Sequence, residues 1–101
     1  MKEAWLKCMI TPGQFSCEYA VEGTMHNDEG FSLFACDYDL KLESEPTDMK
    51  RSRGLIRVEV IQTSDTLALI RLPRSTMENG DCVTVTLNDL TWASSSVETV
   101  Q

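Results

Sequence analysis

The segment at residues 4–23 constrains the fold of this chain most, because apolar and polar residues alternate on both sides of a Thr-Pro-Gly-Gln sequence at positions 11–14. Side chains alternate between the two faces of a strand, so this pattern predicts a β-hairpin with one apolar face. The apolar face is predicted to pair Ala4 with Val21, Leu6 with Tyr19, Cys8 with Cys17 and Ile10 with Phe15. The other face is mostly polar and pairs Lys7 with Glu18. A slip of one residue would bring both charges into the core, so we expect the alternation to fix the register.

Further short strands follow this hairpin. Apolar or alternating runs predict strands over residues 31–36, 37–43, 54–62, 66–72 and 82–87, where 37–43 either continues the preceding strand past a bend or forms a separate strand. The side chains expected to face the core are Ile56, Val58, Val60, Val83, Val85 and Leu87. The 54–62 and 66–72 strands are predicted to pair with Val60 opposite Leu67 and Val58 opposite Leu69. Because residues 67–70 are apolar on both faces, we expect the 66–72 strand to be central.

The intervals between the strands carry loop and turn signals. Residues 44–53 are polar, contain a proline and show no apolar periodicity, which predicts an exposed loop. Ser75 followed by Glu78 matches a capping box and predicts one turn of helix. The Asn79-Gly80 pair predicts a tight turn before the last long strand.

These elements predict an all-β fold, a small antiparallel barrel with five to seven short strands and at most one helical turn. The order of the elements and the ending Asn79-Gly80-Asp81-x-Val83-x-Val85 are similar to the SH3-like group of small barrels. That resemblance implies a fold and no function. The sequence shows no internal repeat.

The length of 101 residues suits one domain, which we expect to span residues 1–92, followed by a disordered Ser-rich tail at 93–101. The net charge is −7, and residues 1–49 carry ten acids and three basic residues, whereas 50–101 carry six of each. An acidic domain is poorly suited to nucleic acid or an anionic membrane surface, so neither is expected as a partner. The chain lacks the apolar segment of a signal peptide, which predicts a cytoplasmic location.

The four cysteines are expected to be reduced, and those on apolar faces to act as small core residues. Their spacing contains no C-x-x-C pair, which argues against a zinc site. Cys8 and Cys17 face each other in the predicted register, so a disulfide on oxidation is the alternative.

Catalytic patterns are missing from the sequence. It contains no nucleophile elbow, no Gly-rich phosphate loop and a single histidine, His26. Asp37 and Asp39 share a predicted strand face about 7 Å apart, but alternation on an acidic surface explains them without catalysis. We therefore expect no enzyme, no cofactor and no metal site.

Five residues are the predicted interface candidates: Trp5, Met9, Arg51, Arg53 and Trp92. Trp5 and Met9 fall on the polar face of the first hairpin, where with Ala20 they would form an apolar patch, unless Trp92 and the tail cover it. Aromatic and Met side chains are enriched in interfaces. Arg51 and Arg53 belong to a basic island that suits an acidic partner or the acidic half of a second copy.

The leading hypothesis is a non-enzymatic small β-barrel that acts through protein contacts or homo-oligomerisation. The alternative is a small-ligand or metal-binding barrel, possibly enzymatic, whose pocket is lined by Cys36, Tyr38 and the loop around His26.

Overall fold

The computed structural model describes residues 2–47, 50–78 and 80–92, and it confirms the all-β, small antiparallel barrel-like fold. The described residues form eight strands rather than five to seven, with two single turns of 3-10 helix and no α-helix. The elements are β1 (Lys2–Pro12), β2 (Glu18–Thr24), β3 (Gly30–Cys36), η1 (Asp37–Asp39), β4 (Leu40–Leu42), β5 (Ser52–Ser64), β6 (Leu67–Thr76), β7 (Gly80–Thr86), η2 (Leu87–Asp89) and β8 (Leu90–Trp92).

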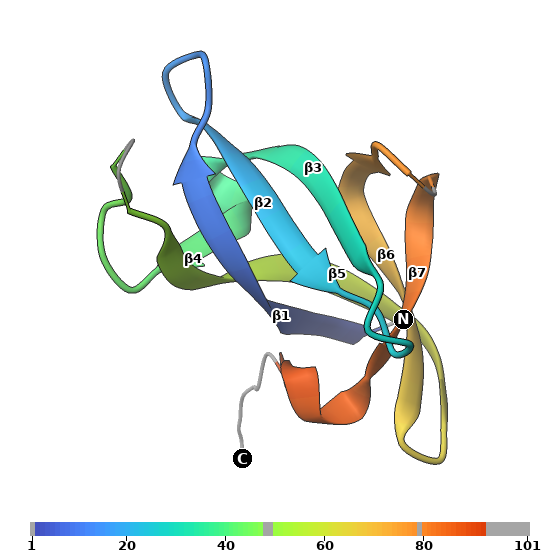
Figure 1. Cartoon of the computed structure of the whole chain (residues 1–101). Helices are drawn as coiled ribbons and strands as arrows, with labels where there is room; N and C mark the ends of the chain where they lie inside the picture. The colour runs from blue at the N-terminus through green and yellow to red at the C-terminus, as the bar shows by residue number, and fades with distance from the viewer. Residues whose placement is uncertain (1, 48–49, 79, 93–101) are drawn as a thin grey trace.

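All eight strands belong to one sheet in the order β3-β2-β1-β5-β6-β7, with β4 added to β5 and β8 added to β1. The sheet curls into a half-barrel, so that β3 approaches β6 (Figure 1). Two turns bond to its outer strands. The backbone N–H of Met77 donates to the carbonyl of Ser32 at 2.9 Å, and that of His26 donates to the carbonyl of Thr84 at 3.0 Å. These bonds engage edge groups that would otherwise be open to another chain.

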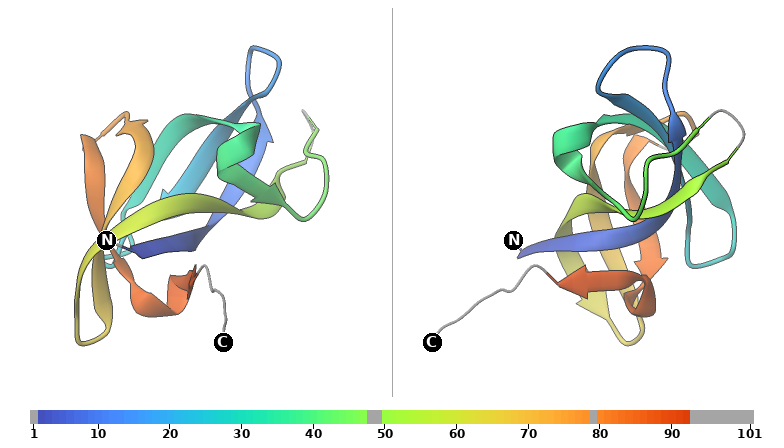
Figure 2. Two further views of the ribbon diagram at one scale, coloured as in Figure 1. Left: turned by 180° about the vertical axis from the view of Figure 1, so that it is seen from behind. Right: turned by 90° about the vertical axis from the view of Figure 1, so that its left-hand side faces the viewer.

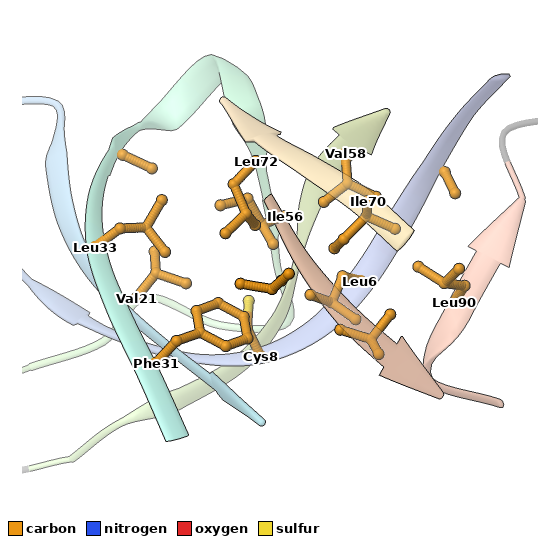
Figure 3. Close-up of a cluster of buried hydrophobic side chains, with 14 of the residues drawn as sticks. Leu6, Cys8, Val21, Phe31, Leu33, Ile56, Val58, Ile70, Leu72 and Leu90 are labelled. Carbon is orange, nitrogen blue, oxygen red and sulfur yellow. The ribbon is translucent and has the colours of Figure 1, made fainter. Parts of the chain in front are cut away.

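The concave side of the sheet holds the core (Figure 3). Residues at alternate positions of β1 and β5, including Leu6, Ile10 and Ile56, are buried, as the alternation predicts. Full burial of a side chain of this size stabilises the fold by about 1.5–3 kcal/mol. Of the other residues predicted to face inward, Val58, Val60, Val83 and Val85 are buried, while Leu87 lies in η2 and is partly buried against the core.

The predicted register of the first hairpin is wrong. In the structure Ile10 pairs with Val21, and Cys8 lies opposite Gly54 of β5. The turn is longer than expected and closes where the N–H of Gly13 donates to the carbonyl of Glu18 at 2.9 Å. The partner of Ile10 is Val21 rather than the predicted Phe15, a shift of six residues. Because six is an even number, the residues predicted to face the core on each strand stay on that face. Cys17 sits in the turn, and both it and Cys8 are free thiols.

The predicted register of the second hairpin is also wrong, and here the face changes. Val60 pairs with Ile70, and Ile61 is bulged between two ladder pairs. Ala68, Ile70 and Leu72 are therefore buried, whereas Leu67 and Leu69 point outward and are half-exposed. The central place of this strand is confirmed, because β6 lies between β5 and β7.

The helical turn predicted at Ser75 does not form, since β6 continues to Thr76. Instead of capping a helix, the Glu78 carboxylate accepts bonds from the N–H and the hydroxyl of Ser32, both at 3.0 Å. The 37–43 segment is a 3-10 turn followed by a separate strand. The predicted loop at 44–53 is shorter, because β5 begins at the buried Ser52. The turn residue Asn79 and the tail at 93–101 lie outside the described residues.

The structure contains a repeat that the sequence did not reveal. The order β1, β2, β3, η1, β4 recurs as β5, β6, β7, η2, β8. Leu40 of the first half pairs with Ile56 of the second. The residues fifty positions away from these two, Leu90 and Leu6, also pair with each other. Leu6 and Ile56 themselves pair at the centre of the β1–β5 ladder. Each half thus gives its last short strand to the first strand of the other half (Figure 2). Residues fifty positions apart in the two halves are called mates below.

Candidate functional site

A depression with a volume of about 600 Å³ lies over β1, β2, β4 and β5. We call it the β1 hollow and define it by Lys7, Met9, Lys41, Leu42, Arg53 and Leu55. Ladder pairs share a face, and Met9 pairs with Arg53, Lys7 with Leu55, and Leu55 with Lys41. The outward positions of three strands therefore form one surface.

A gap in strand pairing opens the hollow along β1. On the edge away from β5, β1 pairs with β2 over residues 9–12 and with β8 over residues 4–6. Lys7 and Cys8 lie between these two partners. Gly54 lies across the ladder from Cys8, and a Cβ atom there would come within 2.6 Å of the Lys41 carbonyl oxygen. The glycine lets the Ile10 side chain and the Lys41 carbonyl approach closely, and the gap in strand pairing leaves a hollow where the sheet would otherwise be continuous.

The apolar part of the hollow comes from Met9 and Leu55 on the outward positions and from Leu42, which packs against the core; all three are half-buried. Three cations surround it. The ammonium group of Lys41 stands 4.3 Å from the centre of the Trp5 ring, which fixes its position by a cation–π contact. Lys7 and Arg53 form no ion pair within the part of the chain that the structure describes.

Acidic side chains also lie around the apolar part of the β1 hollow. Glu22 is engaged by Arg51, whose guanidinium donates to it at 2.7 Å. Glu43 and Asp89 line the hollow without an ion pair to any described residue. The site therefore combines an apolar floor with charges that are available to a binding partner.

The mate of this hollow shows a different arrangement of charge. It has a volume of about 480 Å³, and Arg57, Asp39 and Val58 replace Lys7, Asp89 and Cys8. Arg57 donates to the Asp39 carboxylate at 2.5 Å, and this bond raises the pKa of Arg57 above its ordinary value. Arg71 bonds Glu59 at 3.2 Å. Two ion pairs thus join charges of the mate hollow, which Glu3 and Asp81 also line, whereas Lys7 and Asp89 form no such pair.

The predicted interface residues are distributed around the β1 hollow. Met9 and Arg53 line it and face each other across the β1–β5 ladder. Arg51 borders a neighbouring depression of about 400 Å³ that also includes Met9. Trp5 is half-buried and holds Lys41, and Trp92 on β8 is 44% exposed, with Lys2 5.9 Å from its ring centre.

The predicted patch of Trp5, Met9 and Ala20 is only partly present. Ala20 pairs with Thr11 and with Phe34, toward the far end of β1 from Trp5. Lys41 and Leu55 line the hollow as well, and the sequence alone did not predict them as site residues. The alternation of the 37–43 segment places Lys41 on a polar face, but only the β4–β5 pairing brings it to the hollow.

The alternative pocket of His26, Cys36 and Tyr38 is not assembled. Cys36 and Tyr38 lie near each other at the end of β3, where Arg74 donates to the Cys36 sulfur at 3.3 Å. His26 precedes the other end of this seven-residue strand, about 20 Å away at the rise of an extended chain. Across residues 2–47, 50–78 and 80–92, no three His, Cys, Asp or Glu side chains gather closely enough to hold a metal ion.

The acidic pair considered for catalysis is also separated by its environment. Asp37 is exposed on η1, whereas Asp39 is buried and paired with Arg57. These residues lie in a 3-10 turn rather than on one strand face.

Comparison of the chain with protein-family models, curated proteins and solved structures found no match. None of the described segments forms a helix long and apolar enough to cross a membrane. The site is therefore interpreted from its own geometry.

Proposed function

We propose that this chain is a non-enzymatic interaction module and that the β1 hollow is its protein-binding surface. The observation that carries the proposal is an apolar floor bordered by side chains of both charges, of which Lys7, Arg53, Glu43 and Asp89 form no ion pair with any described residue. A partner that presents an apolar side chain beside charged groups buries this floor and pairs with these charges, and such complementarity sets the orientation of the contact.

The composition of the hollow supports protein binding. Met side chains adapt to different partner shapes and are enriched in interface cores. Lys41 is held over Trp5 before any partner arrives. A surface that is ordered in advance loses less conformational entropy when it binds.

The test is a double variant, Met9→Ser with Leu55→Ser, compared with the wild type. The matched control is Leu67→Ser with Leu69→Ser, which removes two half-exposed outward side chains from β6, away from the hollow. We expect the first variant to lose self-association in sedimentation velocity and capture of partners from the native source, and the control to keep both. Equal behaviour of the two variants would remove the hollow as the interaction surface.

A second candidate function is the binding of a small anionic ligand in the same hollow. Its volume of about 600 Å³ lies within the usual range of small-molecule sites, about 300–1,000 Å³. A rise in melting temperature with small carboxylates or phosphates, lost in a Lys41→Gln variant, would favour this function. The SH3-like classification, the cytoplasmic location and the exclusion of nucleic acid, membrane and metal stay predictions.

A further inference from the structure

The turn between β1 and β2 projects from the body of the sheet (Figures 1 and 2). It carries four successive exposed residues, one of which is Phe15. Phe15 is 71% exposed, the most of any large apolar side chain in the described ranges. Aromatic side chains are enriched in interfaces and often anchor them, and a projecting turn leaves this ring accessible to a partner. We call residues 13–17 the tip.

The tip has a defined conformation. The N–H of Gly13 donates to the carbonyl of Glu18 at 2.9 Å, and the N–H of Glu18 donates to the carbonyl of Phe15 at 3.2 Å. A Cβ atom at Gly13 would come within 2.6 Å of the Glu18 carbonyl oxygen, so the close approach requires glycine. Phe15 is thus presented on a closed turn, which reduces the entropy lost on docking.

The base of the tip is acidic. Glu18 follows it directly, and Asp37 is held beside it because its N–H donates to the carbonyl of Cys17 at 3.1 Å. After burial, the charges of Glu45 and Asp37 are the next causes that raise the pKa of Tyr19 at the start of β2. An exposed aromatic side chain complements the apolar floor of the β1 hollow. The carboxylates at its base complement the three cations that line the hollow, where Glu43 and Asp89 lie as well.

We infer that the β1 hollow of one copy receives the tip of a second copy. Phe15 packs on Met9 and Leu55 of the neighbour, and the acidic base of the tip faces Lys7, Lys41 and Arg53. The inference rests on the proposed function and names its partner. The tip is held away from the hollow of its own chain, because residues 9–12 and 19–22 are locked together in the β1–β2 ladder.

The tip and the hollow are different surfaces, so the contact is heterologous rather than two-fold symmetric. Each copy then has one donor surface and one acceptor surface. Repetition of the contact gives a ring if the rotation closes and a filament if it does not. This property permits a test that a symmetric dimer would fail.

The experiment uses two full-length variants, a tip variant Phe15→Ser and a hollow variant Met9→Ser with Leu55→Ser. Wild-type chain is expected to form species larger than a monomer in native mass spectrometry. Loss of an interface anchor weakens association by about thirty-fold or more, so each variant alone should be monomeric. A mixture should form a one-to-one pair, because the tip variant keeps its hollow and the hollow variant keeps its tip. The two masses differ, which identifies the mixed pair.

The control is Phe34→Ser, which removes an exposed ring from β3, outside the tip and the hollow, and should assemble as the wild type does. Circular dichroism verifies that every variant is folded. Larger species of the tip variant, a mixture that stays monomeric, or a wild type that is monomeric throughout would each overturn the inference. If the hollow variant alone loses assembly or partner capture, another occupant fills the hollow, and the proposed function survives without this inference.

Discussion

Single residues at mate positions show how one framework acquired two different hollows. Cys8 and its mate Val58 are both buried, so the same core position accepts a thiol or an isopropyl group. Lys7 and its mate Arg57 both point outward, but only the guanidinium forms an ion pair. Arg and Lys differ in this way because the planar guanidinium matches a carboxylate and the ammonium is a point charge.

Cys8 gives a prediction for the pH dependence of stability. Burial raises the pKa of its thiol from the ordinary value of 9.0 to about 12. Below pH 9 both folded and unfolded chains keep the proton, and this group makes no pH-dependent difference. As the pH rises from about 9 toward 12, only the unfolded chain ionises, so the free energy of unfolding falls by about 1.4 kcal/mol per pH unit.

The measurement is urea unfolding at about pH 8 and about pH 10.5, where Cys8 alone should cost the wild type about 2 kcal/mol at the higher value. Cys8→Val introduces the residue found at the mate position. Its free energy of unfolding is expected to fall less between the two pH values than that of the wild type. Because the other titrating groups are common to both proteins, the difference isolates Cys8. If the free energy of unfolding fell by the same amount in both proteins, the Cys8 thiol would ionise as easily in the folded chain as in the unfolded chain, which would contradict the prediction.

At the level of elements, the alternation of the sequence predicts which side chains of a strand are buried but does not select the partner. The shift in the first hairpin left Ile10 and Val21 inward, because an even shift keeps the faces unchanged. In the second hairpin the bulge at Ile61 shifted the pairing register of β5 and β6 by one residue. As a result Ile70 rather than Leu69 lies in the core. A bulge has no signature in a binary pattern, which explains why the predicted face of β6 was wrong.

The candidate site was predictable only where one strand supplied the signal. Met9 was singled out because it is apolar on a polar face, and Arg53 because it belongs to a basic island. Their contact depends on the β1–β5 ladder, which joins segments distant in the sequence. Lys41 and Leu55 entered the hollow through the β4–β5 pairing. The alternation of residues 37–43 predicts a strand and its faces but carries no signal for the strand with which it pairs.

The two 3-10 turns give a prediction with an internal control. Asp39 in η1 and its mate Asp89 in η2 occupy equivalent places, but only Asp39 is buried and bonded to an arginine. Asp39→Asn removes a charge-assisted bond whose arginine partner is partly solvated, so the loss in unfolding free energy should be about 1–2 kcal/mol. Asp89→Asn should stay within about 0.5 kcal/mol of the wild type. Urea unfolding of both variants at neutral pH tests this, and equal losses would contradict the asymmetry of the two hollows.

At the scale of the whole molecule, the two halves are interleaved rather than placed side by side. Mate positions share their apolar pattern on β1 and β5, as in Leu6 with Ile56, but not on β2 and β6, where buried Val21 has the exposed Arg71 as its mate, and few are identical. This is why no repeat is visible in the sequence. Because β4 completes β5 and β8 completes β1, neither half holds all the strands that cover its own core.

The interleaving predicts that the chain unfolds in one transition, and the two tryptophans provide the probes. Trp5 lies in the first half and Trp92 in the second. Trp92→Phe leaves Trp5 on β1 as the reporter, and Trp5→Phe leaves Trp92 on β8, the strand by which the second half pairs with β1. In urea, each variant should give the same midpoint by fluorescence and by circular dichroism, because loss of either half removes a strand from the other. Comparison within each variant cancels the effect of the substitution on stability. If fluorescence and circular dichroism diverge in either variant, the halves unfold separately, and the exchanged strands β4 and β8 do not bind them into one cooperative unit.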